Sequence, residues 1–131
     1  MIDRLKKHHI GIIITENKSK KLEKRFKKKF KLDRIQGTRV MFVYDDDLKI
    51  FREYIIKEGR VKNLPLGLAH ICYSVKNKKQ LQEIEEFISN KKLGFPVTQL
   101  EKSGSKECGF VKFFYMKNFN LIELNIESIN D

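Results

Sequence analysis

The sequence has no apolar run approaching the length needed to cross a bilayer, and it has only two cysteines. Two thiols are too few for a disulfide framework, and reduced cysteines are usual in a reducing compartment. Residues 1–7 lead straight into a strand pattern, without the apolar core of a signal peptide. We therefore expect a cytoplasmic protein that needs no disulfide and has no membrane partner.

The composition is that of a globular chain. Hydrophobic residues make up 40% of the sequence and charged residues 34%, which argues against a disordered or membrane-embedded protein. A chain of 131 residues is long enough to bury a core of its own. We therefore predict a single domain over residues 1–131.

The net charge of +11 raises the question of a nucleic-acid partner, because much of the excess lies in one segment, residues 18–31, KSKKLEKRFKKKFK. Leu22, Phe26 and Phe30 are spaced four apart, which places them on one face of a helix and leaves the lysines on the other faces. A lysine-coated amphipathic helix is usually a solvated surface, and we interpret this one so rather than as a nucleic-acid site. Its charge can still steer an anionic ligand toward the protein.

Two short stretches of the chain repeat each other. The run HHIGIII at residues 8–14 returns as AHICYSV at residues 69–75, and each has the pattern of a strand in which a histidine opens an apolar run. His9 and His70 lie about half the chain length apart, which predicts two copies of one structural unit. A histidine that is duplicated in this way is a candidate metal ligand.

The remaining pattern predicts the same order of elements in both halves. Each half opens with a strand, continues with an amphipathic helix and closes with strands, so we predict an α+β fold of two modules at about residues 5–60 and 68–127. The glycines and proline of residues 57–67 indicate a linker between the modules. The predicted elements are strands at 7–15, 39–44, 48–56, 68–75, 110–116 and 120–126, and helices at 17–31 and 78–92.

Taken together, these motifs resemble the vicinal oxygen chelate superfamily, which includes glyoxalase I, bleomycin resistance proteins and extradiol dioxygenases. The resemblance covers residues 5–127 and is nearest to the methylmalonyl-CoA epimerase and glyoxalase-like branch. It implies two βαβββ modules that form a curled mixed sheet around a shared cavity. The motifs that carry it are HHIGI at 8–12, the lysine-rich helix, LAHICYSV at 68–75 and NLIELNI at 120–126.

The resemblance also implies a metal site with one ligand from the first strand and one from the last strand of each module. Carried over to this sequence, the first-strand ligands are His9 and His70, and the last-strand ligand of the second module is Glu123. Two imidazoles and a carboxylate suit a divalent ion such as Zn, Ni, Co or Mn. Glu123 lies between apolar neighbours, where burying a carboxylate is costly unless it is paired or bound to a metal.

The fourth ligand position, on the last strand of the first module, departs from the pattern of the superfamily. Matching residues 48–54 with residues 120–126 places Phe51 at the position where relatives carry Glu or Gln. Glu53, two residues further along and on the same side of the strand, is one alternative ligand. The other alternative leaves the position to water or substrate, with Phe51 as a wall of the substrate site.

For function, the resemblance implies a divalent-metal-dependent isomerase or lyase that removes a proton next to a metal-bound carbonyl. Glu123 or Glu53 would carry the proton, and Phe51 and Arg39 would contact a small-molecule substrate, such as an anionic thioester or an oxo compound. The second acid–base glutamate of the epimerases falls at or beside Val40 in this sequence. That departure keeps open a non-catalytic, resistance-type protein that only binds a small molecule. Relatives of this length are commonly dimers, so we expect a homodimer.

Overall fold

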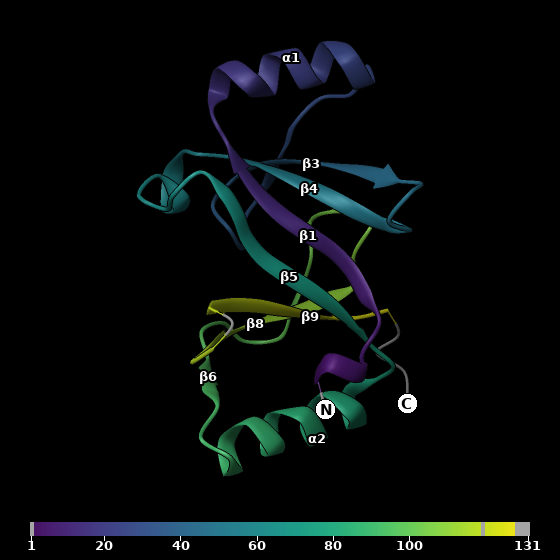
Figure 1. Cartoon of the computed structure of the whole chain (residues 1–131), viewed down its shortest axis with the longest axis vertical. Helices are drawn as coiled ribbons and strands as arrows, with labels where there is room; N and C mark the ends of the chain where they lie inside the picture. The colour runs from purple at the N-terminus through teal and green to yellow at the C-terminus, as the bar shows by residue number, and fades with distance from the viewer. Residues whose placement is uncertain (1, 119, 128–131) are drawn as a thin grey trace. The chain divides into compact units, whose positions relative to one another are not determined.

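The computed structural model describes residues 2–118 and 120–127, which contain two α-helices and nine β-strands (Figure 1). Parallel and antiparallel strand pairs both occur, so the predicted α+β class is confirmed. The chain divides into two compact units: unit 1 is Met1–His8 with His70–Asp131, and unit 2 is His9–Ala69. Neither described helix is long and apolar enough to span a membrane.

The sheet of unit 2 has the strand order β2-β3-β4-β1. β1 and β4 run parallel, whereas β3 pairs antiparallel with both β2 and β4. The short strand β2 was not predicted from the sequence, because three residues are too few to show an alternating pattern. The bounds are Lys7–Ile14 for β1, Lys31–Asp33 for β2, Thr38–Asp45 for β3 and Ile50–Ile56 for β4.

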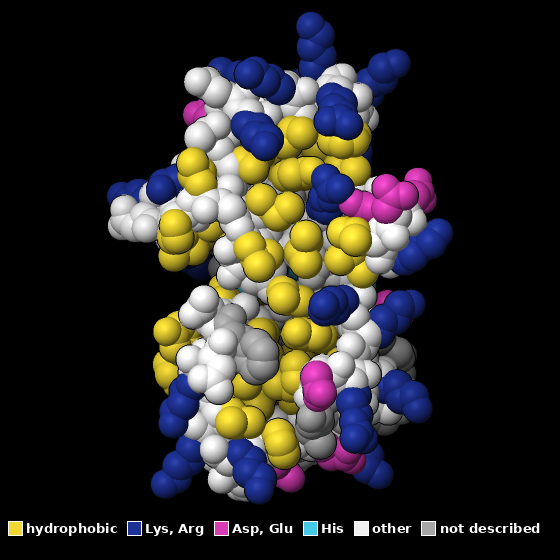
Figure 2. Space-filling model, in the orientation of Figure 1, with side chains coloured by type: hydrophobic (Ala, Val, Ile, Leu, Met, Phe, Trp, Pro, Cys, Tyr) yellow, Lys and Arg dark blue, Asp and Glu magenta, His cyan; other side chains and the backbone are white. Residues whose placement is uncertain are grey.

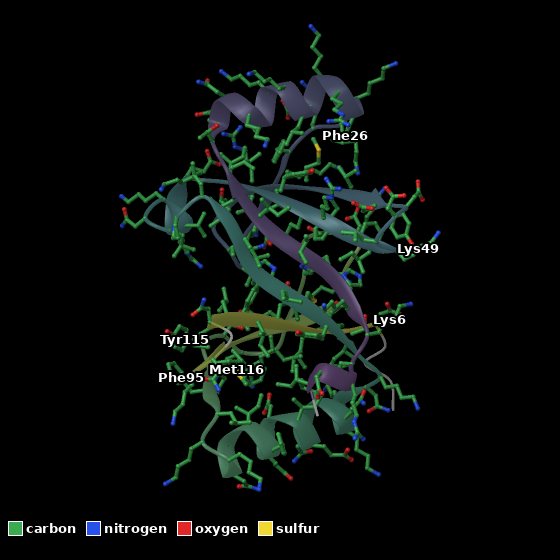
Figure 3. All side chains as sticks on the ribbon, viewed as in Figure 1. Lys6, Phe26, Lys49, Phe95, Tyr115 and Met116 are labelled. Carbon is green, nitrogen blue, oxygen red and sulfur yellow. The ribbon has the colours of Figure 1, made fainter. Side chains whose placement is uncertain are left out.

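Helix α1 (Glu16–Phe26) covers one face of this sheet (Figure 1). Thr15 caps its start by accepting a hydrogen bond from the Lys18 amide at 3.2 Å. Lysine and arginine side chains gather over the helix (Figure 2), while Phe26 lies on the side of the strands (Figure 3). The helix and sheet enclose a core of Ile14, Leu22, Phe30, Met41, Tyr54 and Ile56.

The predicted end of this helix at residue 31 was wrong, because α1 ends at Phe26. Lys27 adopts a left-handed conformation with a φ of 53°, which closes the helix. Beyond it, the Phe30 amide donates to the Glu23 carboxylate at 2.8 Å. Phe30 thus reaches the predicted apolar core from the segment after the helix rather than from the helix itself.

Unit 1 contains a second sheet segment, with the strand order β5-β9-β8-β6 and with β7 also paired to β8. β5 and β9 run parallel, and the pairs of β8 with β9, β6 and β7 are antiparallel. Phe95 and Tyr115 lie side by side across β6 and β8 (Figure 3), with ring centroids 5.6 Å apart. The bounds are Gly67–Val75 for β5, Gly94–Pro96 for β6, Glu101–Lys102 for β7, Phe110–Met116 for β8 and Asn120–Ile126 for β9.

Helix α2 (Lys78–Asn90) was predicted to be amphipathic, and it packs on this segment through buried Leu81, Ile84 and Ile88. Asn77 caps the helix by accepting from the Gln80 amide at 2.9 Å. The N-terminal residues belong to the same core, since Ile2 packs in it and the Ser74 amide donates to the Lys6 carbonyl at 2.7 Å. This packing explains why residues 1–8 group with the second half of the chain.

In both units, strand alternation separates a helix-covered face from an opposite face. In unit 2, Tyr54 and Ile56 of β4 pack in the core under α1, so Glu53 and Ile55 point to the other side. In unit 1, Ile122 and Leu124 of β9 pack in the core with α2, so Glu123 points to the other side. The chemically interesting residues therefore lie on the faces that the helices do not cover.

Candidate functional site

In unit 2, His9 and Glu53 form a buried pair on neighbouring parallel strands. Their exposed fractions are 0% and 2%, and His9 Nε2 lies 3.3 Å from Glu53 Oε1. The register sets Phe51 opposite His9 and Gly11 opposite Glu53, so the glutamate reaches diagonally to the histidine. Phe42 is opposite Glu53 on β3 and packs edge-on against the imidazole, with ring centroids 5.1 Å apart.

In unit 1, His70 and Glu123 form a pair of the same construction. Their exposed fractions are 2% and 4%, and His70 Nε2 lies 3.1 Å from Glu123 Oε1. The register sets Leu121 opposite His70 and Cys72 opposite Glu123. Phe113, opposite Glu123 on β8, packs edge-on against the His70 ring at 5.3 Å between centroids.

The strand registers identify Glu53 as the residue equivalent to Glu123, which corrects the sequence match that placed Phe51 there. Phe51 is opposite His9, and Leu121 is opposite His70, so these two residues are equivalent. Each glutamate follows two residues later on the same strand. The match was wrong by two residues, because strand side chains alternate with a period of two and a shift by two leaves the pattern unchanged. Phe51 instead packs its ring against Tyr44 of β3, with centroids 5.2 Å apart.

The structure does not bring Arg39 together with the pair of unit 2. Arg39 is one residue before Val40 on β3 and lies on the α1 side, where its guanidinium contacts Glu58 at 2.7 Å and Glu16 at 3.2 Å. The hydrogen bonds from Arg39 hold the pKa of Glu58 below its usual value. Arg39 thus has an ion-pairing role on the helix-covered face, and the predicted substrate contact has no support from its position.

Sequence reasoning missed Gln36, which contacts Glu53 from the turn between β2 and β3. Gln36 Nε2 donates to Glu53 Oε2 at 2.8 Å and to Asp33 Oδ2 at 2.8 Å. Asp33 is only 5% exposed, and this burial raises its pKa although the hydrogen bond from Gln36 opposes the shift. A polar residue in a turn carries no sequence signal for such a contact, because Gln36 and Glu53 meet only when β3 pairs with β4.

Both pairs fit two adjacent ligand positions of a divalent ion. An ion that binds an imidazole nitrogen and a carboxylate oxygen at about 2.0–2.2 Å holds these atoms about 2.9–3.5 Å apart. The observed separations of 3.3 Å and 3.1 Å fall within that interval. Nitrogen and carboxylate donors also match the preferences of Zn, Ni, Co and Mn. The same separations fit a plain ion pair between a protonated histidine and its glutamate.

No protein-family model matches the sequence, and no curated protein matches it. Solved structures do share its fold. A methylmalonyl-CoA epimerase from Streptomyces coelicolor, in complex with 2-nitronate-propionyl-CoA, is 15% identical, with a TM-score of 0.61 over 95% of this chain and 99% of its own. The Mycobacterium tuberculosis methylmalonyl-CoA epimerase is 12% identical, with a TM-score of 0.66 over 94% of this chain and 88% of its own.

A 2,3-dioxygenase, LapB from Pseudomonas sp. KL28, has the same fold in part of its longer chain. It is 17% identical, with a TM-score of 0.54 over 93% of this chain and 40% of its own. Methylmalonyl-CoA epimerases and dioxygenases are the proteins that the sequence motifs resemble, and at 12–17% identity these likenesses are likenesses of fold. The resemblance that the sequence motifs indicated is thereby confirmed at the level of the fold.

Proposed function

We propose that this protein is a divalent-metal-dependent isomerase or lyase that moves a proton next to a carbonyl group of a small molecule. The observation that carries the proposal is the buried His–Glu pair that recurs in each unit. Burying a carboxylate is costly without a compensating charge, and here it occurs twice at equivalent positions.

In this proposal His9, Glu53, His70 and Glu123 hold one ion, with two ligands from each unit. The equivalence of the pairs supports a shared ion, because the superfamily resemblance implies one ligand from each first strand and one from each last strand. Glu53 takes the ligand position that the sequence match had given to Phe51. When bound, the ion supplies a Lewis acid that polarises a substrate carbonyl and stabilises negative charge on its oxygen.

The proton step is assigned to Glu123. A carboxylate that binds an ion through one oxygen can move a proton only with its second oxygen, and Gln36 already donates to that oxygen in Glu53. β3 presents Val40 and Phe42 on the face of Glu53, and neither side chain can exchange a proton. One base that removes and returns the proton on the same side fits an isomerase or lyase better than a two-base epimerase.

The proposed substrate is a small carbonyl compound or thioester with an oxygen substituent near the reacting carbon. The rings of Phe42 in unit 2 and Phe113 in unit 1 pack against the two imidazoles and exclude water from that side. The net charge of +11 favours an anionic substrate, because it raises the rate of encounter. A homodimer remains our expectation, and light scattering of the purified chain would test it.

Metal analysis of purified protein, with His9→Ala and His70→Ala as variants, tests the shared site. We expect one divalent ion per chain in the wild type and loss of that ion in both variants. Glu86→Ala is the control, because Glu86 is exposed on α2. The proposal fails if the wild type holds no stoichiometric ion. Two ions per chain, with each variant losing one, would mean that the pairs bind separately.

The second candidate is a protein that binds a small molecule without transforming it. Val40, at the place of the second acid–base glutamate of the epimerases, favours this candidate. Hydrogen exchange in D₂O distinguishes the two, with methylmalonyl-CoA and a panel of α-hydroxy and α-oxo carbonyl compounds as probes. Deuterium incorporation next to the carbonyl supports the enzyme, whereas saturable binding of a compound without incorporation supports the binding protein.

A further inference from the structure

The two carboxylate oxygens of Glu53 have different surroundings. Oε1 faces the His9 Nε2 atom at 3.3 Å, whereas Oε2 accepts a hydrogen bond from Gln36 Nε2 at 2.8 Å. The same Gln36 nitrogen donates to Asp33 Oδ2 at 2.8 Å, so the two hydrogens of one amide are shared between two carboxylates. Gln36 therefore distinguishes one oxygen of Glu53 from the other.

The turn that carries Gln36 is held in place by Asp33. Asp33 Oδ1 accepts from the Ile35 amide at 3.0 Å and from the Gln36 amide at 3.4 Å, and the Gly37 amide donates to the Asp33 carbonyl at 2.8 Å. Gly37 has a φ of 67°, a left-handed conformation that favours glycine. These contacts fix the turn, and with it the position from which the Gln36 side chain reaches Glu53.

We propose that Gln36 is a positioning residue that restricts Glu53 to one-oxygen ligation. This inference rests on the proposed metal-dependent function and extends it to a residue outside the ligand set. With Oε2 hydrogen-bonded to Gln36, only Oε1 is presented on the side of His9, so Glu53 occupies a single coordination position. A coordination position is thereby kept for substrate, and the proton step is left to Glu123.

Outer residues that orient a ligand act on affinity even though they never touch the ion, and their removal typically lowers metal affinity about 10- to 100-fold. Gln36→Met keeps the length and volume of the side chain but removes both N–H donors. Glu53 would then rotate and lose its fixed orientation toward His9. Gln82→Met is the matched control, since Gln82 is exposed on α2 in unit 1.

The experiment is a calorimetric titration of metal-free protein with Zn²⁺, with chelator competition where binding is tight, together with urea unfolding of the same samples. We expect Gln36→Met to bind Zn²⁺ about 10- to 100-fold more weakly than the wild type, and Gln82→Met to match the wild type. A Gln36→Met variant that is less stable to urea but binds Zn²⁺ with unchanged affinity would overturn the positioning role. That result would leave the proposed function intact.

If the wild type itself does not bind Zn²⁺, the proposed function loses its support, and the positioning role is decided on the metal-free protein. The Gln36 side-chain amide should then show slow hydrogen exchange in ¹⁵N-resolved NMR spectra. Glu53→Met removes both acceptor oxygens and should speed the exchange of the Gln36 hydrogen that is donated to Glu53, while the hydrogen donated to Asp33 stays protected. Fast exchange of the Gln36 amide in the wild type, or protection of both its hydrogens in Glu53→Met, would refute the inference.

Discussion

The His–Glu pairs of the two units are alike in construction, while the turns and loops beside them are tied to the sheet in different ways. Each pair joins neighbouring parallel strands, and each histidine ring packs edge-on against the phenylalanine opposite its glutamate. In unit 2, a glutamine from a turn fixes the second oxygen of Glu53. In unit 1, the loop before β8 is tied to β9 through Asn125, whose Oδ1 accepts from the Gly109 amide at 2.8 Å.

This difference shows how duplicated units can diverge in chemistry while their fold is kept. The strand register that brings a glutamate to a histidine depends on backbone pairing and is the same in both units. The contact of Gln36 with Glu53 depends on one turn, which is free to change without disturbing the sheet. In the proposed function the two equivalent carboxylates take different roles, with Glu53 as a ligand only and Glu123 as a ligand that also carries the proton.

The largest expected effect concerns this division of roles. Glu123→Gln should lower hydrogen exchange of a substrate in D₂O by about 10²- to 10⁴-fold, because general acid–base catalysis is lost. The loss in Glu53→Gln should be at least about tenfold smaller, because an amide oxygen still serves as a ligand. The compound of the test panel that exchanges fastest with the wild type is the probe, followed by NMR. Equal losses in the two variants would contradict the asymmetry.

The packing of the two pairs can be compared by removing their aromatic partners. Phe42→Ala and Phe113→Ala each delete a buried ring and should lower the free energy of unfolding by about 3–5 kcal/mol. Urea unfolding measures both. Tyr115→Ala, at an exposed position of the same sheet, serves as the control and should have a much smaller effect. A loss below about 1 kcal/mol at either phenylalanine would show that its unit is loosely packed at the pair.

The pH dependence of stability should reveal the buried carboxyl group that anchors the turn of unit 2. Burial raises the pKa of Asp33 above its ordinary value of 3.8, so the folded protein holds this proton more tightly than the unfolded chain. The resulting stabilisation is complete below the ordinary pKa and is lost as pH rises through the raised one. The free energy of unfolding should therefore fall with rising pH across that interval.

Asp33→Asn should flatten this decline, measured by urea titration at a series of pH values. Asp45→Asn gives a control of opposite sign, because the Leu48 amide and Arg52 lower the pKa of Asp45. That group stabilises the fold above its ordinary pKa and loses the effect as pH falls. An unchanged pH profile in Asp33→Asn would show that Asp33 does not titrate differently in the folded state.

The smallest effect is expected at Arg39, on the helix-covered face of unit 2. Its ion pairs with Glu16 and Glu58 are partly exposed, so Arg39→Met should change the free energy of unfolding by at most about 1 kcal/mol. Hydrogen exchange of the substrate should be unchanged. A tenfold or greater loss of substrate affinity in this variant would restore the substrate contact that the sequence analysis predicted for Arg39.

The sequence alone determined the α+β class, the two-module order and the superfamily resemblance, because these depend on local periodicity and on motifs that repeat. It also singled out His9 and His70 through the repeated strand motif, and Glu123 through the superfamily resemblance and its apolar neighbours. The end of α1 was misjudged, because the left-handed turn at Lys27 and the contact from Glu23 to Phe30 leave the apolar spacing intact.

Only the tertiary structure decided which glutamate belongs to His9 and what holds it. A shift of two residues along a strand keeps every side chain on the same face, so Phe51 and Glu53 are indistinguishable by alternation, and the pairing of β1 with β4 selects Glu53. The same holds for Gln36 and Arg39, whose partners lie far away in the sequence. Such contacts between distant residues depend on how the strands pair in the folded chain. Strand pairing leaves no local pattern in the sequence.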